Sequence, residues 1–182
     1  MSRVFVHATV SLDGFMADEQ GEIGWMEDCP SVPEDEALIA GVVADVGAVV
    51  GGANKTQTIE DGEIPYGGLP DVPVFLMTHH PRGPIEKNGV TYEFLDDIDA
   101  AVAAAKTAAG DRWVSLLGGS IARQCLERGL VDEIRLHVVP IVLGRGISLF
   151  SGLSQPVELE RVDTAAYDSA VHLRYRVVSV AT

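Results

Sequence analysis

The first segment with a regular pattern lies near the N-terminus, where apolar and polar residues alternate from Arg3 to Val10. A period of two with many β-branched residues is typical of a β-strand, because successive side chains of a strand point to opposite faces. The pattern stops at Asp13-Gly14, a pair that favours a turn. We therefore expect a strand over Arg3–Val10 followed by a turn.

The pattern becomes helical after residue 30. Residues 31–34 read Ser-Val-Pro-Glu, which is the S-x-x-E spacing of a capping box, and apolar residues follow at intervals of three and four. This predicts a helix from about Val32 to Ala44. The wholly apolar run Gly47–Val50 comes next and ends at Gly51-Gly52, as is typical of a strand buried on both faces of a parallel sheet.

Strand-like and helical segments continue to alternate along most of the chain. The last two strand-like segments, 157–162 and 171–180, have only a short link between them, which predicts an antiparallel pair. The pattern indicates an α/β fold in a single domain over residues 1–182, with a mostly parallel central sheet and antiparallel C-terminal edge strands. The intermediate strands are expected over 72–78, 90–94, 113–117 and 134–139, and the helices over 96–109 and 120–128.

Composition narrows the range of partners. The formal net charge is −14, and the 13 Lys and Arg residues are scattered, so the sequence has no basic stripe for nucleic acid. Cys29 and Cys125 lie far apart without CxxC spacing, which is typical of free thiols in a reducing compartment. The N-terminus does not resemble a signal peptide, and no apolar run reaches the roughly 20 residues of a membrane span. We expect a cytoplasmic protein that binds neither nucleic acid nor membrane.

Several ordered motifs then point to a known family. The blocks 114–121 (VSLLGGSI), 129–136 (GLVDEIRL) and 140–150 (PIVLGRGISLF) together resemble the C-terminal half of the RibD reductase-domain family. Residues 8–15 (ATVSLDGF) resemble its N-terminal signature, and residues 49–52 (VVGG) lie where dihydrofolate-reductase-like proteins carry a glycine-rich turn. The resemblance implies a dihydrofolate-reductase-like three-layer sandwich, NADPH as cofactor, a small-molecule substrate and a homodimer.

The glycine pairs are the candidate cofactor contacts. A pyrophosphate approaches backbone N–H groups closely only where no Cβ intrudes, and a following helix adds partial positive charge. A branched side chain at Gly119 is therefore expected to block NADPH while leaving the fold largely intact, although a turn that needs positive φ also explains a glycine there. The predicted cofactor-binding residues are Gly51, Gly52, Lys55, Thr56, Thr78, Arg82, Gly118, Gly119, Ser120 and Ile121.

One departure from the family motif leaves the choice between NADPH and NADH open. Ala53 stands where the family usually has arginine after the glycine pair. A 2′-phosphate is normally held by Arg or Lys, so Lys55 or Arg82 would have to supply this charge. Residues 78–82 (THHPR) also fit an exposed polar turn that ends at its proline.

Two carboxylates are candidate catalytic residues. Asp13 follows a strand at the edge where open α/β sheets bind ligands, and the family resemblance has it orient or protonate the substrate; the alternative is a simple Asp-Gly turn. Asp35 shares the apolar face of its helix, where partial burial is expected to raise its pKa; the alternative is favourable charge at a helix N-terminus. The histidines His7, His137 and His172 lie in strand patterns without metal-ligand spacing, so we expect no metal site.

The combined reading is an NADPH-dependent reductase that transfers hydride to a small heterocyclic or aminopyrimidine-type substrate. The resemblance implies an activity like that of 5-amino-6-(5-phosphoribosylamino)uracil reductase in riboflavin biosynthesis. Two alternatives remain open from the sequence. One is a dihydrofolate or pterin reductase, which requires Asp35 to point into the pocket, and the other is a nucleotide-binding module without turnover.

Overall fold

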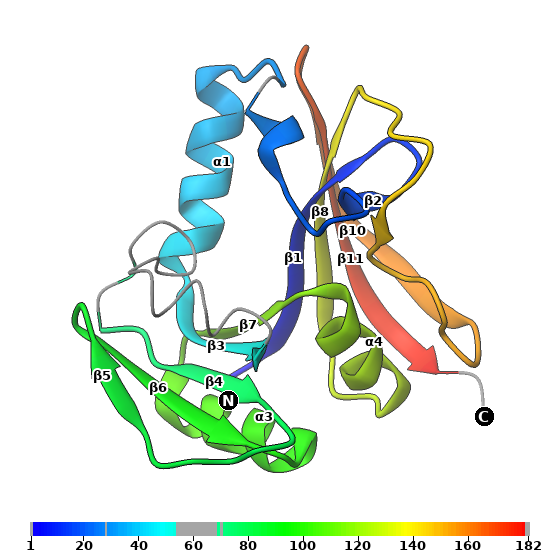
Figure 1. Ribbon diagram of the computed structural model, residues 1–182. Coiled ribbons are helices and arrows are strands. Elements are labelled where there is room, and N and C mark those ends of the chain that lie inside the picture. Colours follow the sequence, from blue (N-terminus) through cyan, green and yellow to red (C-terminus); the bar gives the residue numbers. More distant parts are fainter. Residues whose placement is uncertain (1, 28, 54–68, 70, 181–182) are drawn as a thin grey trace.

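A computed structural model describes residues 2–27, 29–53, 69 and 71–180, and its central feature is a nine-stranded sheet (Figure 1). The strand order is β10-β11-β8-β1-β7-β3-β4-β6-β5. Its strands are β1 (Val4–Ser11), β3 (Val46–Gly52), β4 (Val74–Met77), β5 (Ile85–Lys87), β6 (Val90–Leu95), β7 (Trp113–Leu117), β8 (Glu133–Val139), β10 (Val157–Ala166) and β11 (Val171–Val180). The short strands β2 (Phe15–Ala17) and β9 (Ile147–Ser148) form a separate antiparallel pair.

The sheet confirms the predicted mixture of parallel and antiparallel strands. From β8 to β6 the neighbours run parallel, whereas β11 and β10 add antiparallel strands at one edge. β3 is buried along nearly its whole length, as its continuous apolar run predicts. β5, an antiparallel strand at the opposite edge, is a short strand that the sequence pattern did not predict.

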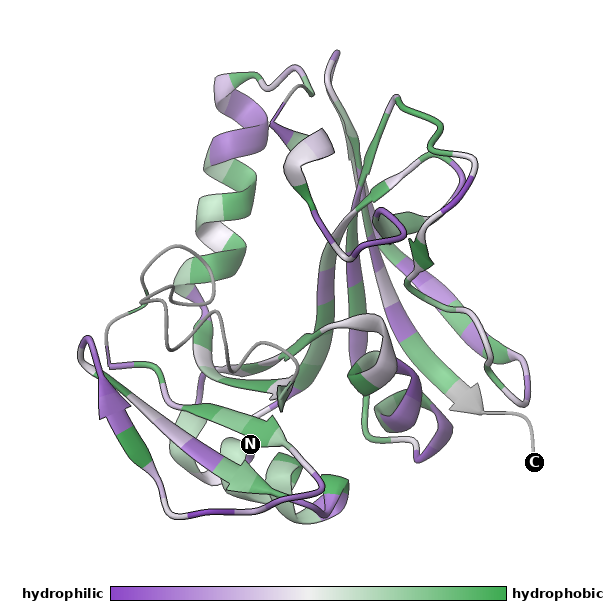
Figure 2. Ribbon diagram, in the orientation of Figure 1, coloured by the Kyte–Doolittle hydropathy of each residue, from purple (hydrophilic) through white to green (hydrophobic). Residues whose placement is uncertain are grey.

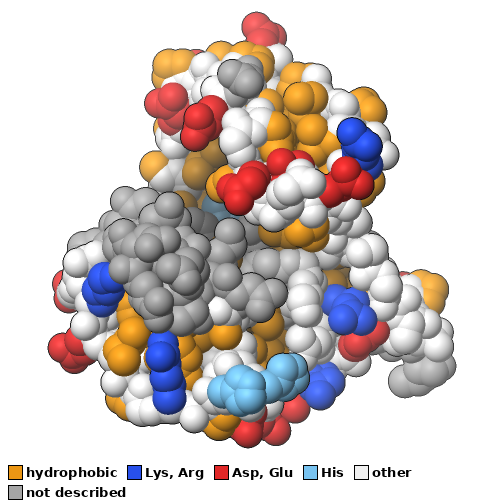
Figure 3. All heavy atoms as spheres, in the orientation of Figure 1, with side chains coloured by type: hydrophobic (Ala, Val, Ile, Leu, Met, Phe, Trp, Pro, Cys, Tyr) orange, Lys and Arg blue, Asp and Glu red, His pale blue; other side chains and the backbone are white. Residues whose placement is uncertain are grey.

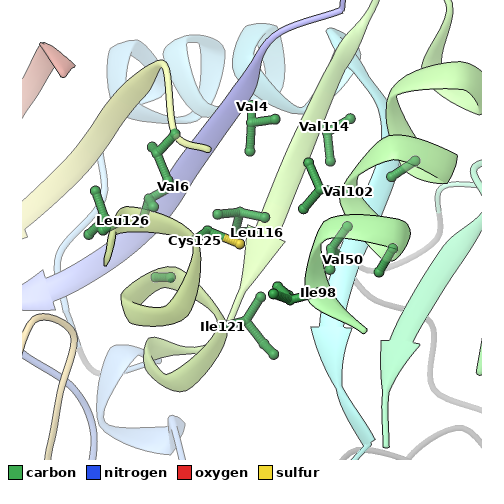
Figure 4. Close-up of a cluster of buried hydrophobic side chains, with 14 of the residues drawn as sticks. Val4, Val6, Val50, Ile98, Val102, Val114, Leu116, Ile121, Cys125 and Leu126 are labelled. Atoms are coloured by element: carbon green, nitrogen blue, oxygen red, sulfur yellow. The ribbon is translucent and has the colours of Figure 1, made fainter. Parts of the chain in front are cut away.

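Helices cover both faces of the sheet and give it three layers. Alternate residues of β1 separate the two cores: Val4 and Val6 face α3 (Ile98–Ala109) and α4 (Gly119–Glu127), in the cluster of Figure 4. Phe5 faces the other way into a second cluster, against which Val42 of α1 (Pro33–Ala44) packs. In Figure 2 the hydrophobic residues accordingly follow the central strands and the inner sides of α3 and α4.

Two helices show how the local sequence sets the helix ends. Asp97 caps α3 by accepting a hydrogen bond from the backbone N–H of Ala100, and Gly110 follows the helix with a φ of 63°. The predicted capping box of α1 is wrong by one position, since Val32 and not Ser31 is the N-cap. Because α1 begins at Pro33, Asp35 is its third residue, the position whose side chain bonds to the N-cap backbone in a capping box. Its Oδ2 accepts a hydrogen bond from the N–H of Val32 at 3.2 Å.

Two further observations concern the environment of the chain. Cys29 and Cys125 are not joined in a disulfide, as predicted, and Cys125 is a buried residue of α4. Among the residues that the structure describes, no helix is both long and apolar enough to cross a bilayer.

Candidate active site

The predicted cofactor residues come together where three neighbouring parallel strands end. β3 lies between β7 and β4, with Gly51 opposite Leu117 and Gly52 opposite Met77. Gly118 and Thr78 directly follow those two partners in the chain, so both glycine pairs and Thr78 share one edge of the sheet. This is the edge at which open α/β sheets bind their ligands.

The Gly118-Gly119 pair has structural reasons of its own. Gly118 has a φ of 96°, a conformation that side-chain-bearing residues rarely adopt. A Cβ on Gly119 would lie only 3.1 Å from the carbonyl oxygen of Ser148 and 3.3 Å from that of Leu149. A side chain at position 119 would therefore crowd the backbone of residues 148 and 149, which would have to shift by a few tenths of an ångström. The effect of a branched residue there on the fold stays a prediction.

The Gly51-Gly52 pair is different, because packing against the described residues does not require it. Neither residue has positive φ. A Cβ on Gly51 would make ordinary contacts of 3.6 Å with the side chains of Leu117 and Leu76, and a Cβ on Gly52 would lie 4.0 Å from Ile121. A ligand can approach the backbone closely only where no side chain intrudes. Glycines that the surrounding described residues do not require therefore fit a site for a bound dinucleotide.

The N-terminus of α4 lies at the same edge of the sheet. No side chain caps this helix, whose N-cap is Gly118. Ser120 is exposed in the first turn, whereas Ile121 is buried and faces Gly52. Backbone N–H groups and the helix dipole favour an anion here, which the acidic chain otherwise repels. The donors present therefore fit the pyrophosphate of a nicotinamide cofactor.

The loop after β4 carries an exposed cation. Arg82 is exposed and its guanidinium carbon lies 4.2 Å from the ring centroid of Phe94 on the neighbouring β6. Thr78 accepts a hydrogen bond through Oγ1 from the N–H of His80 at 3.1 Å. Figure 3 shows exposed histidine side chains at this lower rim of the molecule. The other predicted contacts, Lys55 and Thr56, lie outside the described residues.

Asp13 holds a loop rather than pointing into a buried pocket. Its carboxylate is exposed and accepts hydrogen bonds from Ser11 Oγ at 2.7 Å, from the N–H of Leu143 at 3.1 Å and from the N–H of Gly144 at 2.8 Å. The Ser11 hydroxyl and these backbone N–H groups lower the pKa of Asp13. The ionised carboxylate thus ties the loop after β8 to the end of β1, a geometry that does not favour proton donation.

The loop that Asp13 holds continues along the cofactor edge. The N–H of Leu149 donates to the carbonyl of Gly14 at 3.3 Å, and the carbonyl of Ser148 faces Gly119. Beside this loop, β1 changes its neighbours. It pairs with β7 only up to Val6 but with β8 as far as Ser11. Among the described residues, the edge of β1 from His7 to Ser11 that faces away from β8 has no strand beside it.

Asp35 is buried, and both of its carboxylate oxygens have polar partners within the chain. Oδ1 lies 2.6 Å from Nε2 of His172, and Oδ2 accepts from the hydroxyl of Ser169 as well as from the N–H of Val32. Burial alone would raise the pKa of Asp35, but the donors from Ser169, His172 and Val32 outweigh it and lower the pKa. The predicted rise in this pKa is therefore wrong.

The histidines predicted to be ordinary core or surface residues form a connected series. His7 Nε2 lies 2.6 Å from His137 Nε2, and His137 Nδ1 lies 2.5 Å from His172 Nδ1, which leads on to Asp35. The sequence could have revealed that each lies on a strand, but not that these strands are neighbours. His137 and His172 face each other only because β11 returns antiparallel to β8.

With this geometry established, comparison with known proteins identifies the family. The model of the RibD C-terminal domain matches residues 2–173. The chain belongs to the RibD C-terminal domain family. Two uncharacterized proteins of Bacillus subtilis (strain 168) are each 26% identical to it: YyaP over 93% of this chain and 91% of its own length, and YwjB over 95% and 97%.

Solved structures agree on the fold. A putative riboflavin biosynthesis protein from Shewanella sp. PV-4 superposes with a TM-score of 0.78 and 22% identity, covering 97% of this chain and 99% of that one. The deaminase/5-amino-6-(5-phosphoribosylamino)uracil reductase of Thermotoga maritima gives 0.65 and 16%, covering 97% of this chain and 57% of that one. A dihydrofolate reductase from Enterococcus faecalis, complexed with NADP(H), gives 0.65 and 12% over 97% of each chain. The predicted dihydrofolate-reductase-like fold is confirmed.

Proposed function

We propose that this member of the RibD C-terminal domain family is an NADPH-dependent reductase acting on a small heterocyclic or aminopyrimidine-type substrate. The observation that carries the proposal is the convergence of Gly51-Gly52, Gly118-Gly119 and the N-terminus of α4 at one edge of the sheet. Cys29 and Cys125 form no disulfide with each other, which suits the reducing cytoplasm, where we propose the protein acts.

NADPH, when bound, supplies a hydride to the substrate, so the protein must mainly align the reactants and exclude water. The bare backbone of the two glycine pairs and the first turn of α4, with Ser120 and Ile121, would receive the pyrophosphate. Thr78 and Arg82 would hold the 2′-phosphate end, with Lys55 and Thr56 as further proposed contacts. Asp13 would keep the loop of residues 141–149 against this edge.

The substrate proposal follows from the neighbours and from Asp35. The Thermotoga maritima protein is described as reducing an aminouracil, and the Enterococcus faecalis protein is a dihydrofolate reductase. A pterin-gripping role requires a carboxylate free to bind the ring, yet both oxygens of Asp35 already have partners within the chain. We therefore place an aminopyrimidine substrate ahead of a pterin. A binding module without turnover is the remaining alternative.

Calorimetric titration with NADPH, followed by NADPH oxidation in the presence of 5-amino-6-(5-phosphoribosylamino)uracil, dihydrofolate or a flavin, tests these readings. Saturable binding with oxidation by the aminouracil supports the proposal. Oxidation by dihydrofolate alone would favour the pterin reading, and binding without any oxidation would favour the module. Absence of NADPH binding would contradict the cofactor assignment itself.

A further inference from the structure

The buried series of polar side chains on the α1 face of the sheet has no part in the cofactor site. Asp35 of α1, His172 of β11, His137 of β8 and His7 of β1 come from four different elements, and three contacts of 2.5–2.6 Å join them end to end. Asp35, His137 and His172 are each at most 4% exposed. The series runs across β11, β8 and β1, from beneath α1 to the edge of β1 that has no strand beside it from His7 onward in the part of the chain that the structure describes.

The contacts couple the protonation states of the ring nitrogens along the series. A neutral imidazole carries one N–H and one lone pair, and each contact between two ring nitrogens needs one of each. When Asp35 is ionised, His172 must donate to Asp35, His137 to His172 and His7 to His137. When Asp35 is protonated, every donor is reversed and the second nitrogen of His7, Nδ1, carries a proton. These two arrangements differ by one proton.

We propose that Asp35, His172, His137 and His7 form a proton relay that delivers the proton required by substrate reduction, with Nδ1 of His7, a buried atom just beyond the point where β1 stops pairing with β7, as its donor. The inference rests on the reductase function proposed above. It assigns Asp35 a role at the inner end of the relay, in place of direct contact with a substrate ring. His137 and His172 are positioning residues that pass the proton between the two ends.

The step balances in atoms and charge. Hydride transfer reduces the electrophilic carbon of a C=N or C=O group, and the electron pair of the double bond moves to the nitrogen or oxygen. That atom takes the proton from Nδ1 of His7. The proton of His137 Nε2 then moves to His7 Nε2, that of His172 Nδ1 moves to His137 Nδ1, and that of Asp35 moves to His172 Nε2. Asp35 is left ionised, and one proton from water restores the relay.

A groove of about 150 Å³ beside α1 is lined by His137 and His172, in the middle of the series. Arg174 and Asp163 also line this groove, from β11 and β10. Other groups that face the series are Arg135 of β8, Tyr167 with its ring centroid 5.5 Å from that of His172, and the Ser169 hydroxyl on Asp35. Arg135 and Arg174 both pair with Glu133, which offsets part of their charge.

The resting state at neutral pH is the arrangement with Asp35 ionised. Burial lowers the pKa of His7 to about 4, with Arg135 adding to the effect. Burial, followed by the other two histidines, lowers the pKa of His137 to about 3. Hydrogen bonds from Ser169, His172 and Val32 lower the pKa of Asp35 against its burial. The arrangement with Asp35 protonated is therefore a minor species whose population falls as pH rises, and the proton-dependent rate should fall with it.

Nuclear magnetic resonance of the ¹⁵N-histidine-labelled protein, without cofactor, tests the relay independently of activity. At neutral pH we expect neutral rings protonated at Nε2 of His7, Nδ1 of His137 and Nε2 of His172. Neighbouring rings that both present N–H groups, or both present lone pairs, would overturn the proposal. So would a charged imidazolium ring at any of the three positions.

Replacement of the central histidine tests the function of the relay. In His137→Phe we expect kcat for the aminouracil to fall by about 10²-fold, with the KM for NADPH unchanged and the pH profile of kcat altered. Tyr167→Phe is the matched control, because it keeps a ring against His172 and should leave kcat unchanged. An unchanged kcat and pH profile in a folded His137→Phe would overturn the relay.

A second variant covers the case in which His137→Phe does not fold. Asp35→Asn cannot release a proton to His172 and should lower kcat to a similar extent with NADPH affinity retained. Turnover equal to that of the unsubstituted protein would overturn the relay. Failure of the unsubstituted protein to bind or oxidise NADPH would instead contradict the proposed function, and the ring-tautomer measurement would still decide whether the relay exists.

Discussion

The two candidate carboxylates differ in what surrounds them, and this difference predicts separate effects. Asp13 accepts two backbone N–H bonds from the loop of residues 143–144. Asn would present an N–H group to one of these donors, so the loop would loosen. Asp13→Asn should raise the Kd for NADPH by about tenfold, measured by calorimetric titration.

The control for this substitution is Asp18→Asn. Asp18 also accepts two backbone N–H bonds, from Gln20 and Glu22, but in a neighbouring turn. Asp18→Asn should therefore leave the Kd for NADPH unchanged. A large loss of kcat in Asp13→Asn with unaltered NADPH affinity would instead support proton transfer by Asp13 and contradict its loop-holding role.

Gly52 gives the most direct test of the cofactor site. Among the described residues, the nearest atom to a Cβ there is Cγ1 of Ile121 at 4.0 Å, so Gly52→Ala should fold normally. NADPH affinity should nevertheless fall by about tenfold or more, because the methyl group occupies the path of the cofactor. Thermal melting and calorimetric titration measure the two effects separately.

Gly41→Ala is the matched control, since Gly41 is exposed on α1 with no atom within 4 Å of its Cβ position. Alanine in a helix should stabilise it by about 0.5–1 kcal/mol without changing NADPH binding. Equal NADPH affinities for Gly52→Ala and the unsubstituted protein would remove Gly52 from the cofactor site.

We expect Arg82 to set the preference between the two nicotinamide cofactors. Its guanidinium is exposed and stacks on Phe94 near the strand ends, where a 2′-phosphate would need a cation. Arg82→Ala should raise the Kd for NADPH by about tenfold and leave that for NADH nearly unchanged. Parallel losses for both cofactors would mean that Arg82 acts on the fold of the loop and not on the phosphate.

At the scale of elements, long periodic segments were predictable and short ones were not. The strands and helices of eight or more residues were placed within a few residues of their observed bounds, because burial imposes a period on them. β2, β5 and β9 have only two or three residues, too few to express a period. They form because a turn or a neighbouring loop brings backbone groups together, as Gly14 and the segment 147–149 do here.

The residues of the candidate site likewise fall into those that the sequence predicted and those that it did not. The glycine pairs were recognisable because each follows a buried strand and one of them opens a helix. The histidine series was not, because its contacts join residues 30 or more positions apart and depend on strand register. Asp35 was recognised as inward-facing, but its partners Ser169 and His172 come from the other end of the chain.

The buried histidines of β1 and β8 make folding stability depend on pH. The pKa of His7 is lowered to about 4 and that of His137 to about 3, below the value of about 6.5 in an unfolded chain. The unfolded state therefore binds protons first, and stability is lost as pH falls from about 6.5 towards 4. The expected loss is about 1.4 kcal/mol per pH unit for each histidine, measured by urea unfolding.

His137→Phe should reduce this slope by about one proton, since the variant loses one of the two groups that titrate on unfolding. Carboxylates with lowered pKa values, such as Glu133, act in a different window, because their contribution is lost only below about pH 4.5. A free energy of unfolding that stays constant between pH 6.5 and 4.5 would contradict the buried neutral state of both histidines.

At the scale of the whole molecule, the sheet ends in an exposed edge strand, β10, that could pair with another chain. β10 is the outermost strand, is exposed along nearly its whole length, and carries Leu159 at 42% and Val162 at 47% exposure. In the sheet of the described residues β10 has a neighbouring strand on one side only. An edge strand of ten residues with exposed apolar side chains is a template for pairing with a second chain. We therefore propose that a second copy of this chain covers β10 in a homodimer with two-fold symmetry.

Light scattering coupled to size-exclusion chromatography should give twice the chain mass of 19.4 kDa at micromolar concentration. The double substitution Leu159→Lys and Val162→Lys should shift this to the monomer mass, because like charges would face each other across the two-fold axis. Ile23→Lys is the control, since Ile23 is 55% exposed but lies beside the 3-10 turn Gly24–Met26, away from β10. A monomer mass for the unsubstituted protein would contradict the homodimer, and a dimer that survives the double substitution would place the interface on a different surface.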